Sequence, residues 1–69
     1  MNKREFKAML IKKGLNVKQL AKKIGIGDAC LYRRVNNGTL TLTDINNIIQ
    51  ALDLTEEETM AIFFKKEIA

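Results

Sequence analysis

The 69-residue chain contains no proline, no histidine and no tryptophan, and it has four glycines and one cysteine. The absence of proline and the scarcity of glycine favour an all-helical fold, because both residues destabilise helix interiors. The lone Cys30 has no partner for an internal disulfide or a metal cluster, so we expect it to be a small side chain facing the core. The sequence also lacks a glycine-rich phosphate loop followed by Lys-Ser or Lys-Thr.

The acidic residues give no sign of an active site. Glu56, Glu57 and Glu58 are consecutive at a predicted helix start, where they complement the helix dipole. A general acid and base would instead be separated carboxyl groups. We therefore expect a protein that is not an enzyme and that needs no cofactor and no metal.

The length and charge of the chain further limit the kinds of partner it can have. A single domain over residues 1–69 buries only about 60% of its unfolded surface, which leaves little room for an enclosed substrate pocket. No apolar run approaches the roughly 20 residues of a membrane span, and no signal-peptide pattern is present. We therefore expect a cytoplasmic protein with no membrane partner. The net charge of +4 mildly favours an anionic partner.

What the sequence does contain is a stretch with the pattern of two short helices joined by a tight turn, NVKQLAKKIGIGDACLYRRVNNG, residues 16–38. In the first helix, Leu20, Ala21 and Ile24 recur at helical spacing. Asn16 with Gln19 is a capping-box pattern at its start. Gly25 ends the helix, because glycine readily adopts the left-handed conformation of a helix end.

The second helix of the motif begins near Asp28 and carries Leu31 and Val35 on its buried side. The turn residues Asn36-Asn37-Gly38 end it. A small alanine in the first helix, a glycine in the turn and apolar residues at matching offsets together predict a helix-turn-helix over about residues 16–37.

At these residues the sequence resembles the lambda-repressor and Cro-like (Xre) family, and small Cro-like phage regulators in particular. LAKKIGIG, LYRRV and NNGT stand for the family's motif, and TLTDINNIIQALDLT matches its fourth helix. The resemblance implies an all-α, five-helix, lambda-repressor-like domain. Two departures are Gly27, where a serine usually caps the recognition helix, and Val35, four residues after Leu31 where many members have three.

Three further helices are expected around the motif. The first begins at Asn2 with Glu5 and buries Phe6, Met9 and Leu10, and Gly14 ends it. The fourth begins at Thr41 with Asp44, or at Thr43. It carries an apolar stripe that we expect to form the main wall of the core, made of Leu42, Ile45, Ile48, Ile49 and Leu52.

The last helix begins with the capping box Thr55-x-x-Glu58 and precedes the basic pair Lys65-Lys66. Its apolar residues Met60, Phe63 and Phe64 allow two interpretations. They close the core, or they form a partly exposed patch for a partner or a dimer interface. The resemblance implies pairing of two domains through this region, which would place two recognition helices one DNA turn apart, roughly 34–36 Å.

Base edges need exposed side chains on the outer face of the recognition helix. With Leu31 and Val35 facing inward, the outward positions are Asp28, Ala29, Tyr32 and Arg33. Arg33 can pair with guanine and Ala29 can touch a thymine methyl group. Tyr32 can contact a base or a phosphate. Asp28 can accept from cytosine, or it can act only as a charge or cap at the helix start.

Phosphates need cations and free backbone N–H groups. The start of the first motif helix offers amides at its positive dipole end, and its lysines add charge. The loop after the recognition helix touches the DNA backbone in the resembled family. The candidate phosphate contacts are Asn16, Val17, Lys18, Lys22, Arg34, Asn36, Asn37 and Thr39.

The sequence thus predicts a sequence-specific DNA-binding transcriptional regulator whose partner is a double-stranded DNA operator. The resemblance implies a Cro-like role in a phage or prophage lysis–lysogeny switch, in the cytoplasm of a bacterial host cell, and a homodimer. The alternative is a modulator or antirepressor that binds a partner repressor protein, through residues 28–34 or the terminal apolar patch. Salt dependence would separate the two, because phosphate contacts weaken steeply with salt.

Overall fold

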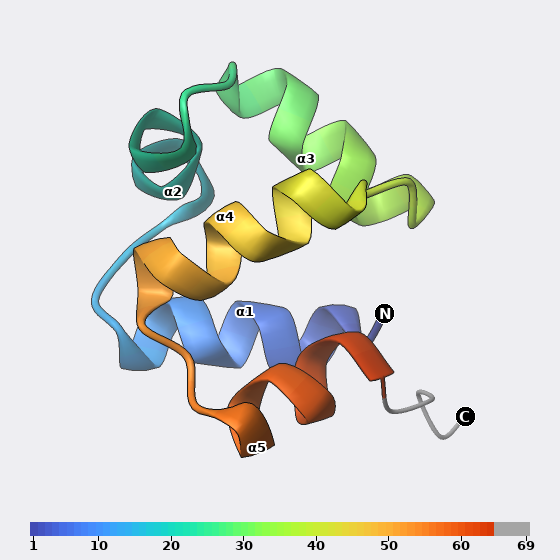
Figure 1. Ribbon diagram of the computed structural model, residues 1–69. Coiled ribbons are helices and arrows are strands. Elements are labelled where there is room, and N and C mark those ends of the chain that lie inside the picture. Colours follow the sequence, from blue (N-terminus) through green and yellow to red (C-terminus); the bar gives the residue numbers. More distant parts are fainter. Residues whose placement is uncertain (65–69) are drawn as a thin grey trace.

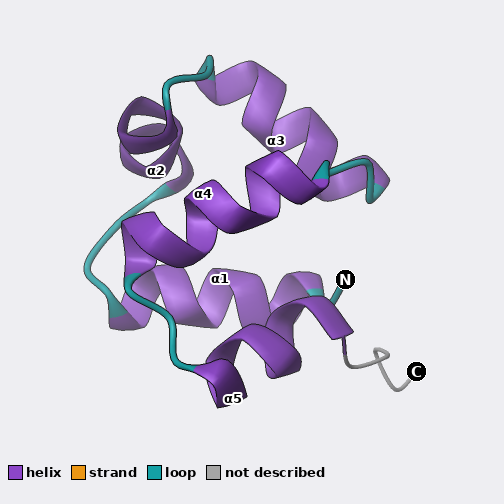
Figure 2. Cartoon of the chain, in the orientation of Figure 1, coloured by secondary structure: helices purple, strands orange, loops and turns teal. Residues whose placement is uncertain are grey.

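Helices make up three-quarters of residues 1–64, the part of the chain that the computed structural model describes (Figures 1 and 2). No strand occurs in that range, which confirms the all-α prediction. The pair Lys65-Lys66 lies outside the described residues. The elements are α1 (Lys3–Lys12), α2 (Val17–Ile24), α3 (Asp28–Asn37), α4 (Leu42–Leu52), α5 (Glu56–Thr59) and a π-helical segment, η1 (Met60–Phe64).

Short-range capping sets the helix boundaries, as the sequence predicts. Capping boxes open α2, α4 and α5, at Asn16, Thr41 and Thr55. In each, the side chain of the capping residue accepts the backbone N–H three residues on, and that third residue's side chain accepts the cap's own N–H. Gly25 ends α2 in the left-handed conformation, with φ of 79°.

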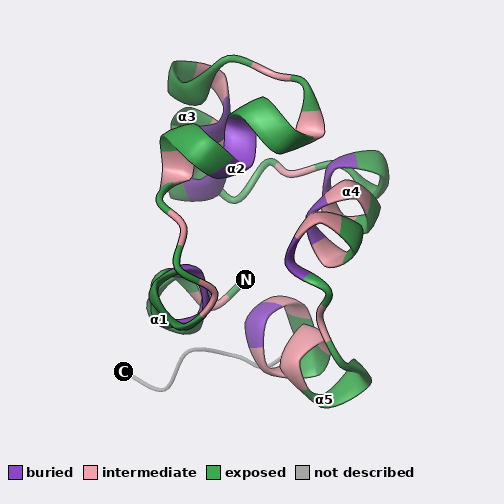
Figure 3. Ribbon diagram, turned by 90° about the vertical axis from the view of Figure 1, so that its left-hand side faces the viewer, coloured by how far each residue is buried: buried purple, intermediate pink, exposed green. Residues whose placement is uncertain are grey.

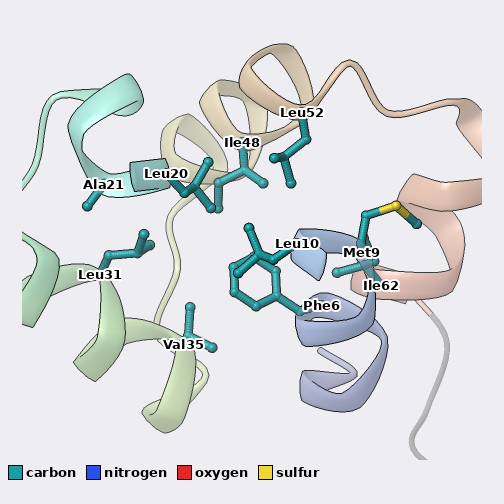
Figure 4. Close-up of a cluster of buried hydrophobic side chains, with 10 residues drawn as sticks. All are labelled: Phe6, Met9, Leu10, Leu20, Ala21, Leu31, Val35, Ile48, Leu52 and Ile62. Atoms are coloured by element: carbon teal, nitrogen blue, oxygen red, sulfur yellow. The ribbon is translucent and has the colours of Figure 1, made fainter. Parts of the chain in front are cut away.

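The core lies where α1, α2, α3, α4 and η1 meet, and its ten buried apolar side chains are drawn in Figure 4. The first three helices supply seven of them and α4 and η1 supply the rest. The two ends of the described chain also meet, since α1 packs along η1. The buried residues are Phe6, Met9, Leu10, Leu20, Ala21, Leu31, Val35, Ile48, Leu52 and Ile62.

Leu42 does not belong to the core, so the predicted five-residue stripe of α4 is wrong at its first position. The Leu42 residue is 78% exposed, whereas Ile48 is fully buried. Six residues separate them, which turns Leu42 roughly 120° around the helix from Ile48. Ile45 and Ile49 are half-buried on the intervening arc.

The C-terminal apolar residues divide between the two interpretations that the sequence allows. Met60 and Phe64 are 52% and 63% exposed, Phe63 is half-buried against the core, and Ile62 is fully buried. In η1 the hydrogen bonds run from i to i+5, so side chains follow a wider spacing than that of an α-helix. Cys30 is also only half-buried, on the flank of α3.

Candidate nucleic-acid interface

The helix-turn-helix is held together by small residues and a short turn between α2 and α3. Ala21 is almost completely buried, and its small side chain lets the two helices pack closely (Figure 4). The amide of Ile26 donates to the carbonyl of Ala21 at 3.0 Å, which fixes the turn directly after Gly25. α3 then begins after Gly27, which offers no side-chain cap.

The outer face of α3 and the start of α2 together form a surface hollow of about 500 Å³. The hollow brings together all four predicted base-reading residues and half of the predicted phosphate contacts, although α2 and α3 contribute them from different parts of the sequence. Its lining residues are Val17, Lys18, Asp28, Ala29, Tyr32, Arg33, Asn36 and Asn37.

The base-reading candidates are exposed, as their position opposite the buried Leu31 and Val35 requires. The largest apolar group among them, Tyr32, has 54% of its surface exposed. Figure 3 shows exposed, intermediate and buried residues following one another along the helices. Neither Asp28 nor Arg33 forms an ion pair or a side-chain hydrogen bond within residues 1–64. Asp28 therefore does not cap α3, and its carboxylate places negative charge in the first turn of the helix.

The start of α2 presents free donors toward the hollow. Asn16 Oδ1 accepts the amide of Gln19 at 2.8 Å, and Gln19 Oε1 accepts the amide of Asn16 at 2.9 Å. The capping box does not use the amides of Val17 and Lys18, which, as the first two of the helix, have no intrahelical acceptor. They lie at the positive end of the helix dipole, where an anion is favoured.

The remaining phosphate candidates lie outside the hollow. Lys22 is exposed on α2 and Thr39 is exposed in the loop after α3, and Asn16 is engaged in its capping box. Arg34 has a different environment: its Nη1 atom donates to the two carboxylate oxygens of Asp44 at 3.0 and 2.9 Å. Sequence reasoning missed this ion pair because its partners are ten residues apart on different helices.

Asp44 is the one buried polar or charged side chain within residues 1–64, with 6% of the residue exposed. Burial raises the pKa of its carboxyl group, but hydrogen bonds from Thr41 and the charge of Arg34 outweigh that effect and lower the pKa below its ordinary value. The Thr41 amide donates to Asp44 Oδ2 at 3.0 Å. Asp44 is therefore a carboxylate at neutral pH.

Only part of the predicted partner interface is exposed on the surface. Met60 lines a second surface hollow, of about 560 Å³, with Glu56, Glu57 and Ala61. Phe64 is exposed nearby in sequence, while Phe63 packs inward. Two members of the predicted set, Met60 and Phe64, are thus accessible, and Met60 lies beside the acidic start of α5.

Residues 1–64 contain no group of three His, Cys, Asp or Glu side chains that could hold a metal ion. Within the same range no helix combines the length and the apolar character needed to cross a membrane.

The sequence matches the family model of the Cro/C1-type HTH DNA-binding domain over residues 5–64. The match runs from within α1 to the end of η1 and so includes α2, α3 and the hollow between them. No curated protein and no solved structure matches the chain significantly.

Proposed function

The chain belongs to the Cro/C1-type helix-turn-helix DNA-binding family, and from that membership we propose that it is a sequence-specific transcriptional regulator that reads double-stranded operator DNA with α3. The observation that carries this proposal is the hollow in which the outer face of α3 meets the start of α2. The proposal includes no catalytic step and no cofactor.

Base readout is assigned to the four exposed residues of α3. Arg33 pairs with guanine O6 and N7 in the major groove, and Ala29 contacts a thymine methyl group. Tyr32 contacts a base edge or a phosphate from the same face. Asp28 accepts from a cytosine amino group and, by repelling phosphate, disfavours docking with the backbone at the helix start.

Phosphate contacts position the domain without reading sequence. One DNA strand is held by the free amides of Val17 and Lys18, with help from the side chains of Asn16 and Lys22. Asn36, Asn37 and Thr39 contact the backbone on the other side of α3. Val17 and Lys18 from the first group, and Asn36 and Asn37 from the second, line the same hollow as the base-reading face. This neighbourhood supports an interface that inserts α3 into the major groove.

The biological setting and the assembly are inferred from the resemblance to small Cro-like regulators. We assign the protein to the lysis–lysogeny switch of a phage or prophage, acting in the cytoplasm of a bacterial host. Pairing of two domains through Met60 and Phe64 would give a homodimer on a palindromic operator. The exposure of Met60 and Phe64 supports the proposed homodimer.

A second function has one observation in its favour. The exposed Met60 and Phe64, of which Met60 shares a hollow with Glu56 and Glu57, would suit docking of another protein as well as of a second copy. A regulator that binds a partner repressor through this surface would not need to read DNA itself.

Selection from a mixed pool of short duplexes, followed by a salt titration of the retained sequences, tests the proposal. A DNA reader enriches a defined site, and log K for that site falls steeply with log salt. If no sequence is enriched and weak binding vanishes at physiological salt, direct reading is wrong. A pull-down with purified repressor of the same host, with Met60→Ser/Phe64→Ser as control, then tests the second function.

A further inference from the structure

The loop between α3 and α4 is bounded on both sides by one polar cluster, formed by Arg34, Thr41 and Asp44. At its start, the amide of Thr39 donates to the carbonyl of Arg34 at 2.9 Å. At its end, the amide of Thr41 donates to Asp44 Oδ2, and the amide of Asp44 donates to Thr41 Oγ1, both at 3.0 Å. The Arg34–Asp44 ion pair joins the two ends.

Arg34 lies on a different flank of α3 from the base-reading residues. It is one residue, roughly 100°, around the helix from Arg33. Its side chain is two-thirds buried, and its guanidinium group donates to Asp44 on α4. The hollow beside α2 does not include Arg34. Its charge is also compensated by Asp44, so the pair as a unit adds little to the field that attracts phosphate.

We infer that Arg34 is a positioning residue for DNA binding and not a phosphate ligand. Held by Asp44, it fixes the last turn of α3 and the loop at residues 38–41 relative to α4. Asn37 and Thr39 are then already held in one conformation before they contact the DNA backbone. This inference rests on the proposed function for its DNA readout, but its structural part can be measured on the free protein.

Two single variants and their combination test the role of the pair. Arg34→Gln removes the charge, and Asp44→Asn removes the partner while keeping an acceptor for the Thr41 amide. Lys22→Gln is the matched control, because Lys22 is an exposed cation with no partner in the described ion pairs. Binding to the enriched duplex is measured over a range of salt, at a temperature where circular dichroism shows every variant folded.

A positioning role predicts the same outcome for both single variants. Each weakens binding, on the order of tenfold, and the double variant is no weaker than either single one, since the residues form one unit. The slope of log K against log salt stays at the wild-type value for all three. Lys22→Gln, in contrast, makes the slope shallower by about 0.9, as the loss of one phosphate contact requires.

A phosphate role predicts the opposite for Asp44. Without the ion pair to the Asp44 carboxylate, Arg34 would bind phosphate more strongly, so the Asp44→Asn variant would bind DNA at least as tightly as the wild type. A slope for Arg34→Gln that becomes shallower by the same amount as for Lys22→Gln would likewise overturn the inference.

Amide hydrogen exchange of the free protein separates this inference from the proposed function. Both single variants should lose protection at the Thr39 and Thr41 amides, while the Leu20 amide in α2 keeps its own. A wild-type chain that retains no duplex refutes the proposed function, and exchange alone then decides whether the pair fixes the loop. Unchanged exchange at Thr39 and Thr41 in both variants overturns the positioning role.

Discussion

The backbone amide of Asn2 donates a 2.7 Å hydrogen bond to the carbonyl of Ile62. This bond joins the cap of α1 to the middle of η1, 60 residues later, where the Ile62 side chain is fully buried against α1. The domain is thus closed by a contact between its two ends, and the closing side chain is neither a phenylalanine nor the exposed Met60.

Ile62→Ala should therefore destabilise the domain strongly, by roughly 2–5 kcal/mol, because it leaves a cavity where α1 and η1 meet. Phe64→Ala, a larger truncation two residues away, should change the free energy of unfolding by less than about 0.5 kcal/mol, since Phe64 is exposed. Urea denaturation of both variants measures the difference. Equal losses would contradict the assignment of Ile62 as the closing residue.

The same comparison can be made within α4. Ile48→Ala should cost roughly 2–5 kcal/mol, whereas Leu42→Ala should be nearly neutral, because Leu42 lies at the exposed first position of the helix. Thermal and urea unfolding of the two variants decide the matter. A large loss for Leu42→Ala would restore the five-residue stripe that periodicity predicts.

In DNA binding, Arg33→Ala should cost roughly 1–3 kcal/mol and relax the preference at one base position, because it removes a contact to a guanine edge. Lys22→Ala should weaken binding to all sequences about equally, because phosphates are the same at every site. Both variants are compared by repeating the duplex selection. If Arg33→Ala left the enriched site unchanged and lost affinity on all duplexes alike, Arg33 would be a phosphate contact.

Acid should destabilise the protein in part through Asp44. Its pKa is lowered in the folded state, so the stabilisation that it provides is complete above the unfolded-state pKa of about 3.9 and is lost as pH falls through the lower folded-state pKa. Asp44→Asn should cost roughly 1.5–3 kcal/mol at pH 7 and flatten the dependence of unfolding free energy on pH below about 4.

Glu58 supplies the control for this measurement. Its pKa is also lowered, by the hydrogen bond from the Thr55 amide and by Lys12 and Lys13. Glu58→Gln should leave unchanged that part of the pH dependence of the unfolding free energy that arises from Asp44. An Asp44→Asn profile that keeps the full wild-type slope below pH 4 would assign the acid response to other carboxyl groups.

Self-association through the C-terminal apolar residues predicts a concentration-dependent sedimentation coefficient for the wild-type chain. Met60→Ser/Phe64→Ser should abolish that dependence without a large change in stability, because both side chains are exposed. Ile11→Ser is the control, since Ile11 is also apolar and 78% exposed, but on α1. Sedimentation of all three proteins over a range of concentrations gives the answer, and loss of association in Ile11→Ser would move the interface to α1.

What the sequence by itself determined is the local structure. The starts of α1, α2, α4 and α5 each depend on a residue and a partner three positions away, as in Asn16 with Gln19, and Gly25 and Gly38 end helices because of their own conformational freedom. The buried faces of α1, α2 and α3 also follow from periodicity within one element. These determinants act over a few residues, so they can be recognised without knowing how the helices pack.

Only the tertiary structure decided how the elements face one another. It paired Arg34 with Asp44, left Leu42 and Phe64 in solvent, and brought the start of α2 beside the outer face of α3. These relationships depend on the angles at which helices cross and on the wider turn of η1, and neither is encoded within a short segment. The residues of the proposed interface could therefore be named from the sequence, but their common surface and the exclusion of Arg34 from it could not.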